Sequence, residues 1–170
     1  MPNKVYQYFT NDHRRLEDLF ERATVNPGRV DEELYAQFRA GLLKHIGLEE
    51  KILLPAVQKR NSGEPLSIAA KLRLDHGAIA ALLVPPPSPA IVSALRAILK
   101  LHDNLEESPG GAYEECEQFI ADDTDSLLEM IRNAPEVPPN PHNPKPYVLD
   151  AVRRALARAG YNFDDYEARE

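Results

Sequence analysis

The stretch IVSALRAILKLHDNLEE, residues 91–107, decides the fold class of this chain. Some of its apolar residues recur at intervals of three to seven: Ile91, Leu95, Ile98 and Leu105. That spacing places them on one face of an α-helix. His102 stands in the same phase, between Ile98 and Leu105. The stretch is therefore predicted to be an amphipathic helix whose buried face includes a histidine.

Three further stretches have the same helical period, and turn-forming residues separate all of them. We expect helices at residues 4–24, 31–60, 67–84 and, after Pro89, up to 107, with breaks at Asn26–Gly28, Asn61–Gly63 and Pro85–Pro89. Asp31 and Ser67 are the expected N-caps, and Pro55 is expected to end or kink the second helix early. No stretch alternates β-branched and polar residues as a strand would. We therefore predict an all-α protein, an up-down-up-down antiparallel four-helix bundle with a C-terminal helical appendage.

The predicted bundle covers residues 1–110, and residues 111–170 form the C-terminal extension. The extension shows a short helical pattern after Gly111 and a last amphipathic helix at about 147–159. Between them, residues 134–146 are rich in proline and are predicted to be extended. We expect the extension to pack back on the bundle; the alternative is that it binds a partner.

The composition excludes several classes of function. The net charge of −7 and the pI near 5.3 argue against a nucleic-acid partner, which would need clustered Lys and Arg. There is no signal-peptide pattern and no apolar run long enough to span a bilayer, so we expect a cytoplasmic protein with no membrane partner. Cys116 is the only cysteine, which rules out an internal disulfide and a thiolate metal cluster. A metal ion would therefore need histidine and carboxylate ligands.

Four of the five histidines fall one to a helix, each in the apolar phase: His13, His45, His76 and His102. In an up-down bundle, residues at equal height on neighbouring helices are equidistant from the connecting turn. The midpoints of successive histidines lie at positions 29, 60.5 and 89, in or beside the expected breaks. The four imidazoles are therefore predicted to lie in one layer inside the bundle. His142 belongs to the proline-rich stretch and is left out of this site.

Two of these histidines begin the same pattern, His-x-x-Leu-Glu-Glu, at residues 45–50 and 102–107. Glu49 and Glu106 lie one helical turn after their histidines and on the same face. Each of these two helices can therefore offer one nitrogen and one carboxylate to a common site. The next residue of each pattern points about 100° away, so Glu50 and Glu107 are expected at the surface or rim.

The other two helices share an Asp-His pair, Asp12-His13 and Asp75-His76. The two aspartates either orient neighbouring imidazoles or are solvated. Glu17 also follows His13 by one turn and is expected on the helix surface. The chain thus contains two related hairpins, in which the glutamates of the His-x-x-Leu-Glu-Glu pattern are placed to bridge two metal ions.

Nitrogen and carboxylate ligands without thiolate suit iron, manganese or zinc. Zinc is usually satisfied by a four-coordinate mononuclear site, whereas bridging carboxylates fit a pair of iron ions with open coordination positions. The ferritin-like pattern Glu-x-x-His is absent, because the residues three before the histidines are Thr10, Leu42, Arg73 and Leu99. The alternative to a metal site is a purely structural bundle in which the histidines are core residues. Such a bundle would leave many buried imidazole nitrogens unpaired.

Over residues 4–107 the sequence resembles the hemerythrin-like (HHE cation-binding) family, through the two Asp-His pairs and the two His-x-x-Leu-Glu motifs. The resemblance implies a non-haem centre of two iron ions with oxo- or hydroxo- and carboxylate bridges. The implied ligands are His13, His45, Glu49, His76, His102 and Glu106. Oxygen-carrying members have a further histidine one turn after the ligand on the third helix, where this chain has Ala80. Reversible oxygen carriage is therefore not expected.

The resemblance implies a metal-binding protein that senses or scavenges a small molecule such as dioxygen, nitric oxide or peroxide. The alternative function is an oxidoreductase, or an iron donor that repairs damaged iron–sulfur clusters. The two differ in whether the site turns over, which the sequence leaves open.

Overall fold

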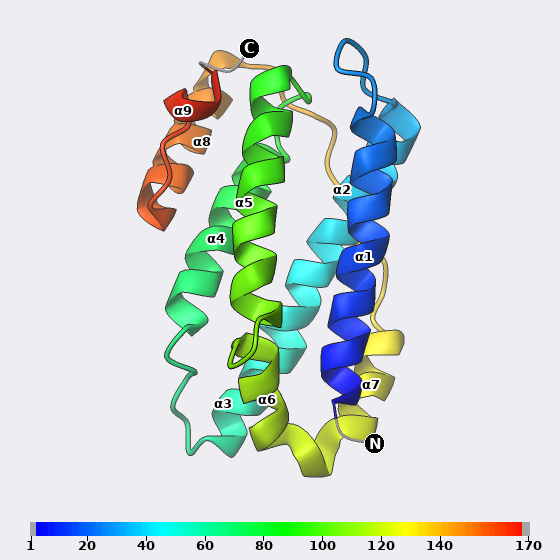
Figure 1. Ribbon diagram of the computed structural model, residues 1–170, viewed down its shortest axis with the longest axis vertical. Helices are drawn as coiled ribbons and strands as arrows, with labels where there is room; N and C mark the ends of the chain where they lie inside the picture. The colour runs from blue at the N-terminus through cyan, green and yellow to red at the C-terminus, as the bar shows by residue number, and fades with distance from the viewer. Residues whose placement is uncertain (1–2, 168–170) are drawn as a thin grey trace.

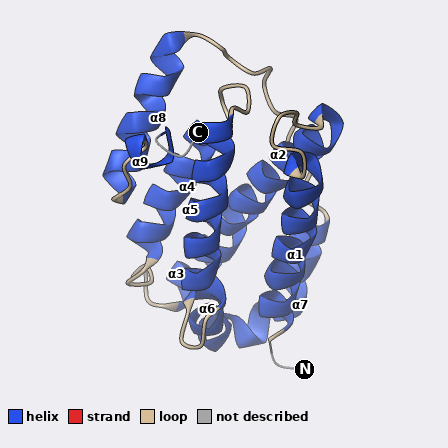
Figure 2. Cartoon of the chain, turned by 45° about the horizontal axis from the view of Figure 1, so that its top comes forward, coloured by secondary structure: helices blue, strands red, loops and turns tan. Residues whose placement is uncertain are grey.

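The computed structural model describes residues 3–167, and every regular element in this part of the chain is helical. Figure 2 shows helices joined by loops, and no strand is drawn among the described residues. In chain order the elements are α1 (Lys4–Thr24), α2 (Glu32–Leu48), the π-helical turn η1 (Glu49–Leu53), α3 (Leu54–Arg60), α4 (Ala69–Leu82), α5 (Pro89–Glu107), α6 (Ala112–Ile120), the 3-10 turn η2 (Ala121–Asp123), α7 (Thr124–Arg132), α8 (Pro146–Ala159) and α9 (Asp164–Glu167). The prediction of an all-α protein is confirmed.

Side-chain capping explains where α2 begins but not where α4 begins. The Asp31 carboxylate accepts a hydrogen bond from the Leu34 N–H at 3.0 Å, as expected of an N-cap. Ser67 does not cap a helix, and that prediction is wrong. Helix α4 begins two residues later, because the backbone first closes a turn in which the Ala69 N–H donates to the Leu66 carbonyl at 3.0 Å.

The distortion expected near Pro55 is the π-helical turn η1, which precedes it. Proline has no N–H to donate and its ring crowds the preceding turn, which widens the helix locally. The Leu54 N–H accordingly bonds to the carbonyl of Glu49, five residues earlier. The widened turn begins at Glu49, one of the expected metal ligands, and short π-helical turns are frequent at functional sites.

The histidine-bearing helices α1, α2, α4 and α5 all contribute to the core, and Figure 1 shows α1 beside α2 and α4 near α5. Helix α1 also contacts α5. The buried apolar side chains form two clusters. Phe9 on α1 belongs to one cluster and Leu16 to the other, and on α2 Leu48 and Leu42 are divided in the same way. His13 and His45 therefore lie in a polar layer between two apolar cores.

The C-terminal extension covers two parts of the surface of these helices. Helix α6 packs against α1, α3 and α5 at one end (Figure 1). Helix α8 lies along α4, and its Val152 and Leu156 join the apolar cluster that contains Leu16. The proline-rich segment between α7 and α8 is non-helical, and the Asn143 N–H donates to the Val84 carbonyl at 2.9 Å. Within residues 3–167 no helix combines the length and apolarity needed to cross a membrane.

Candidate metal centre

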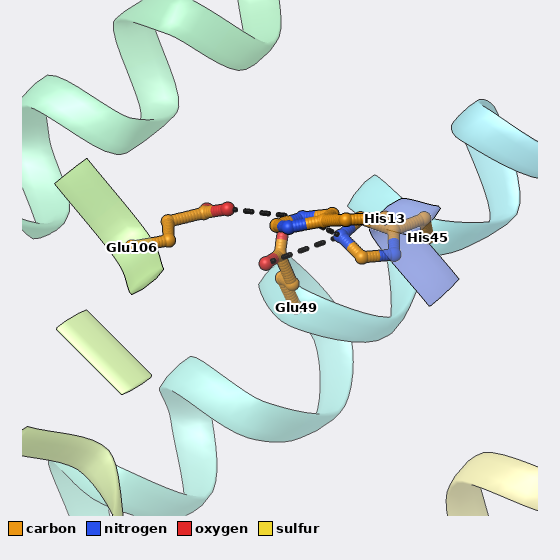
Figure 3. Close-up of side chains that lie close together, drawn as sticks. All are labelled: His13, His45, Glu49 and Glu106. Carbon is orange, nitrogen blue, oxygen red and sulfur yellow. Dashed lines mark hydrogen bonds and ion pairs between the residues drawn. The ribbon is translucent and has the colours of Figure 1, made fainter. Parts of the chain in front are cut away.

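The six expected ligands come together in the polar layer as two groups of four that share both glutamates. One group contains His13, His45, Glu49 and Glu106, and the other contains Glu49, His76, His102 and Glu106. Within each group the donor atoms all lie within 4.8 Å of one another, and all six side chains are buried. Figure 3 shows the Glu106 side chain reaching from α5 toward those of His13, His45 and Glu49.

The histidines of each group face one another through Nε2. These nitrogens are 2.9 Å apart in His13 and His45, and 3.1 Å apart in His76 and His102. Two nitrogens on adjacent positions of an octahedron, each about 2.1 Å from the ion, would lie about 3 Å apart. The spacing of the imidazoles therefore fits two ligands of one ion in each group.

The glutamate oxygens support the same conclusion. Glu49 Oε2 lies 3.1 Å from Nε2 of His76, and Glu106 Oε1 lies 3.0 Å from Nε2 of His102. Both oxygens are buried, and neither has a hydrogen-bond partner in the described part of the chain, so the short distances lack hydrogen-bond alignment. A buried carboxylate oxygen without a partner is costly. Nitrogens and oxygens that converge in this way fit metal ligands better than a hydrogen-bonded core.

The other ring nitrogen of each histidine contacts a carboxylate outside the two groups. The pairs are His45 Nδ1 with Asp12 Oδ2 at 2.8 Å, His102 Nδ1 with Asp75 Oδ2 at 3.1 Å, His76 Nδ1 with Glu50 Oε1 at 3.0 Å, and His13 Nδ1 with Glu107. In each pair the ring N–H must donate, because an ionised carboxylate only accepts. The arrangement fixes the tautomer that leaves Nε2 free to bind a metal ion.

These outer contacts show whether Asp12 and Asp75 orient imidazoles or are solvated, which the sequence left open. Asp12 and Asp75 do orient imidazoles, and each does so for the histidine of the adjacent helix in its own hairpin. Glu50 and Glu107 are partly exposed at the rim, as expected, but each also reaches a histidine of the other hairpin. The rotation of about 100° from the preceding glutamate turns them toward that neighbouring helix.

The charges of the metal-free site are balanced by protons on the histidines. Burial opposes a charged His13 ring, but its contacts with Glu106 and Glu107 raise the pKa to about 10. For His45, burial is likewise outweighed by Glu49 and Asp12, and the pKa is about 9. Burial would raise the pKa of Glu49, yet His45 and His76 lower it well below its usual value. A metal ion must therefore displace protons to bind.

Tyr113 is part of this site and was missed by the sequence analysis. From α6 its hydroxyl donates to Glu49 Oε1 at 2.5 Å and lies 3.0 Å from Glu106 Oε2. The same oxygen is 3.2 Å from Nε2 of His13, and within the described part of the chain it makes no such contact with His76 or His102. A tyrosine in the apolar phase of a helix needs a partner for its hydroxyl, and this requirement was the available signal.

A third group of donors shares His13 with the first group and adds Asp103 and Glu107, which are partly exposed. Asp103 Oδ1 is 3.7 Å from Nε2 of His13, and burial raises the Asp103 pKa to about 6. Both residues line a cavity of about 790 Å³ between α1 and α5. Glu17 also lines this cavity, where it forms an ion pair with Arg14 at 3.3 Å. It belongs to neither of the two groups of donors.

Two further residues lie outside the two groups of donors, as predicted. His142 lies in the proline-rich segment with its ring centroid 6.0 Å from that of Tyr35, outside the two groups. Ala80 follows His76 by one turn of α4 and offers no ligand atom. The two groups that share Glu49 and Glu106 thus contain four histidines and two glutamates.

Residues 4–133 match the family model described as Hemerythrin HHE cation binding domain. The match extends beyond the four histidine-bearing helices through α7, so it includes Tyr113. No curated protein and no solved structure matches the chain significantly.

Proposed function

Because the chain belongs to the hemerythrin HHE cation-binding domain family, we propose that it binds two iron ions in the polar layer. His13 and His45 would be ligands of one ion, His76 and His102 of the other, with Glu49 and Glu106 shared between them. In this proposal α1, α2, α4 and α5 form an up-down-up-down antiparallel four-helix bundle around the pair. The supporting observation is the sharing of both glutamates by the two groups of buried donors.

Iron is proposed over zinc because of the ligand set. Four nitrogens and two shared carboxylates leave positions open on two ions that prefer more than four ligands, whereas zinc is usually satisfied by four. An iron pair would supply reversible one-electron chemistry and open positions for a small ligand. The residues around it orient the imidazoles, balance charge and exclude bulk water.

The partner proposed for this centre is a small molecule such as dioxygen, nitric oxide or peroxide. The cavity beside His13 and Asp103 gives a route from the surface to the first group of donors. Because Ala80 supplies no fifth histidine, both proposed ions would have the same number of protein nitrogens. We therefore propose sensing or scavenging as the function, and not oxygen storage.

An enzyme with the same ligands, which reduces its substrate or donates iron to damaged clusters, is the alternative. The hydroxyl of Tyr113 beside Glu49 gives the site a buried proton donor that a catalytic cycle would use. Turnover separates the two functions. More than one equivalent of peroxide or nitric oxide consumed per site would favour the enzyme, and stoichiometric reaction would favour sensing or scavenging.

Iron binding itself is tested by anaerobic titration with Fe²⁺, followed by metal analysis and an optical spectrum after exposure to air. We expect two iron ions per chain and ligand-to-metal absorption in the near ultraviolet and visible range. The variant His45→Ala should lose iron, while the matched variant His142→Ala, outside the site, should keep both ions. Iron content unchanged in His45→Ala, or a colourless and iron-free protein after the titration, would contradict the proposal.

A further inference from the structure

Arg39 on α2 is a largely buried arginine with no anionic partner in the described part of the chain. The residue is 7% exposed, and its Nε donates to the carbonyl of Leu83 at 2.7 Å. Among residues 3–167, no carboxylate lies within ion-pair distance of it. A largely buried charge without a counter-charge is unfavourable. An anion bound from outside the chain would supply the counter-charge that Arg39 lacks.

Two more polar groups near Arg39 lack partners. Tyr35 lies one helical turn before it on α2, is 1% exposed, and its hydroxyl has no hydrogen-bond partner in the described part of the chain. Nδ1 of His142 is also buried and has no partner among the described residues, although the ring is hydrogen-bonded to the backbone of Val84 and Pro85. The His142 ring lies against the Tyr35 ring, with 6.0 Å between centroids. Two groups capable of donating to an anion, the Arg39 guanidinium and the Tyr35 hydroxyl, are therefore brought together on α2, and the His142 ring of the proline-rich segment lies beside them.

These residues line a groove of about 1010 Å³ where the proline-rich segment passes the ends of α1, α2 and α5 (Figure 1). Prolines from three loops and from the start of α5 form much of its wall: Pro27, Pro86, Pro87, Pro89, Pro139 and Pro141. Arg29 and Arg96 add positive charge at the groove, and Glu32 is the one acid among the described residues that line it. Arg96 is already paired with Glu21. On a chain of net charge −7, the groove is a locally basic site with apolar walls.

We propose that this groove, defined by Tyr35, Arg39 and His142, is a second binding site that takes a small organic anion. The carboxylate or phosphate group of the ligand accepts hydrogen bonds from the Arg39 guanidinium and the Tyr35 hydroxyl. The proline walls pack against its apolar part. The site is separate from the metal-binding groups and does not depend on the function proposed for them.

Isothermal titration of the full-length, iron-loaded protein tests this site with three probes: benzoate, inorganic phosphate and benzyl alcohol. Benzoate should bind with one site per chain, and benzyl alcohol, which has the ring without the charge, should not bind. Phosphate distinguishes the sources of the anion. Tighter binding of phosphate than of benzoate would assign the site to phosphate compounds, and the reverse would assign it to carboxylates. Binding of neither anion would overturn the proposal.

Substitutions then locate the anion in the groove. Tyr35→Phe removes only the hydroxyl, and we expect affinity for the preferred anion to fall by about tenfold or more, as for the loss of one hydrogen bond to a charged group. Arg39→Gln should weaken it by about 30-fold or more. Arg22→Gln loses the same charge at an exposed position of α1 and should change affinity less than about twofold.

Folding and the iron centre provide internal checks. Tyr35→Phe removes an unpartnered buried hydroxyl, so its melting temperature should equal or exceed that of the parent protein. A loss of anion binding in that variant therefore cannot come from unfolding. If benzoate binds equally well to Tyr35→Phe and Arg39→Gln, or if it changes the optical spectrum of the iron centre in both, the anion is bound elsewhere and the proposal is wrong.

Discussion

Asp12 and His45 are joined across two helices: the imidazole N–H at Nδ1 of His45 donates to Oδ2 of Asp12 at 2.8 Å. Asp12 is the immediate neighbour of His13, whose Nε2 faces Nε2 of His45 at 2.9 Å. One Asp-His pair therefore places one proposed ligand and orients another. The pair Asp75-His76 does the same for His102.

Removing this outer contact should weaken metal binding without removing a ligand. In Asp12→Asn the side chain keeps its size but loses the charge that favours the correct tautomer of His45, so we expect metal affinity to fall by about 10- to 100-fold. Competition with a chelator of known affinity measures the change. Asp18→Asn, on the exposed face of the same helix, should leave the affinity unchanged. Equal affinities in the two variants would mean that Asp12 does not orient a ligand.

Substitution of Glu106, which both groups share, should lower the iron content more than substitution of Glu107, which follows it. Glu106→Gln removes a ligand common to both groups, so iron content should fall from two ions per chain toward none. Glu107→Gln removes the contact with Nδ1 of His13 and should retain two ions at lower affinity. Metal analysis after dialysis separates these outcomes. Loss of a single ion in Glu106→Gln would show that Glu106 is not shared.

Tyr113 should stabilise the metal-free protein through the buried carboxylates. In Tyr113→Phe the hydrogen bond to Glu49 is lost, and a hydrogen bond to a charged group contributes about 1.5–3 kcal/mol to the free energy of unfolding. Urea unfolding of the metal-free protein measures this difference. Tyr147→Phe, at a 58% exposed position, should change stability by less than about 0.5 kcal/mol. If the Tyr113→Phe protein were as stable as the parent, the Tyr113 hydroxyl would not stabilise the buried carboxylates.

Metal binding should release protons and strengthen with pH. In the metal-free protein the pKa of His13 is about 10 and that of His45 about 9, so both are protonated at pH 7 and must lose a proton to bind metal. Titration calorimetry in buffers of different ionisation enthalpy counts the protons released. A metal uptake without proton release at pH 7 would contradict the charge balance of the site.

The same shifts set the pH dependence of the metal-free fold. Both folded pKa values lie above 6.5, the value of an unperturbed histidine. The stability that these contacts contribute is therefore complete below pH 6.5 and is lost as pH rises through 9 and 10. Urea midpoints of the metal-free protein should fall between pH 7 and pH 10, and the metal-loaded protein should show a smaller fall. A midpoint that rises over this interval would contradict the pKa directions.

Spacing along the chain was enough to predict the helical class and the convergence of the six donor residues. Histidines such as His45 and His102 fall in the apolar phase of long helices, and a turn of helix fixes the position of the following glutamate. Ser67 failed as a cap because a local turn, which composition does not reveal, delays the start of α4.

Contacts between helices that are distant in sequence could not be predicted. Tyr113 reaches the site from α6, and the contact depends on how that helix packs against α1 and α5. Glu107 contacts His13, 94 positions away, for the same reason. The groove at Arg39 and His142 likewise depends on the path of the proline-rich segment, for which the sequence gives a conformation but no location.

Two iron ions are proposed to lie between Glu49 and Glu106. Crystals of the iron-loaded protein measured on both sides of the iron absorption edge test it most directly, because anomalous differences locate iron without reference to any assumed ligand. We predict two peaks in the polar layer, one beside His13 and His45 and the other beside His76 and His102, with both glutamates adjacent to both peaks. A single peak, or iron located away from these six side chains, would contradict the claim.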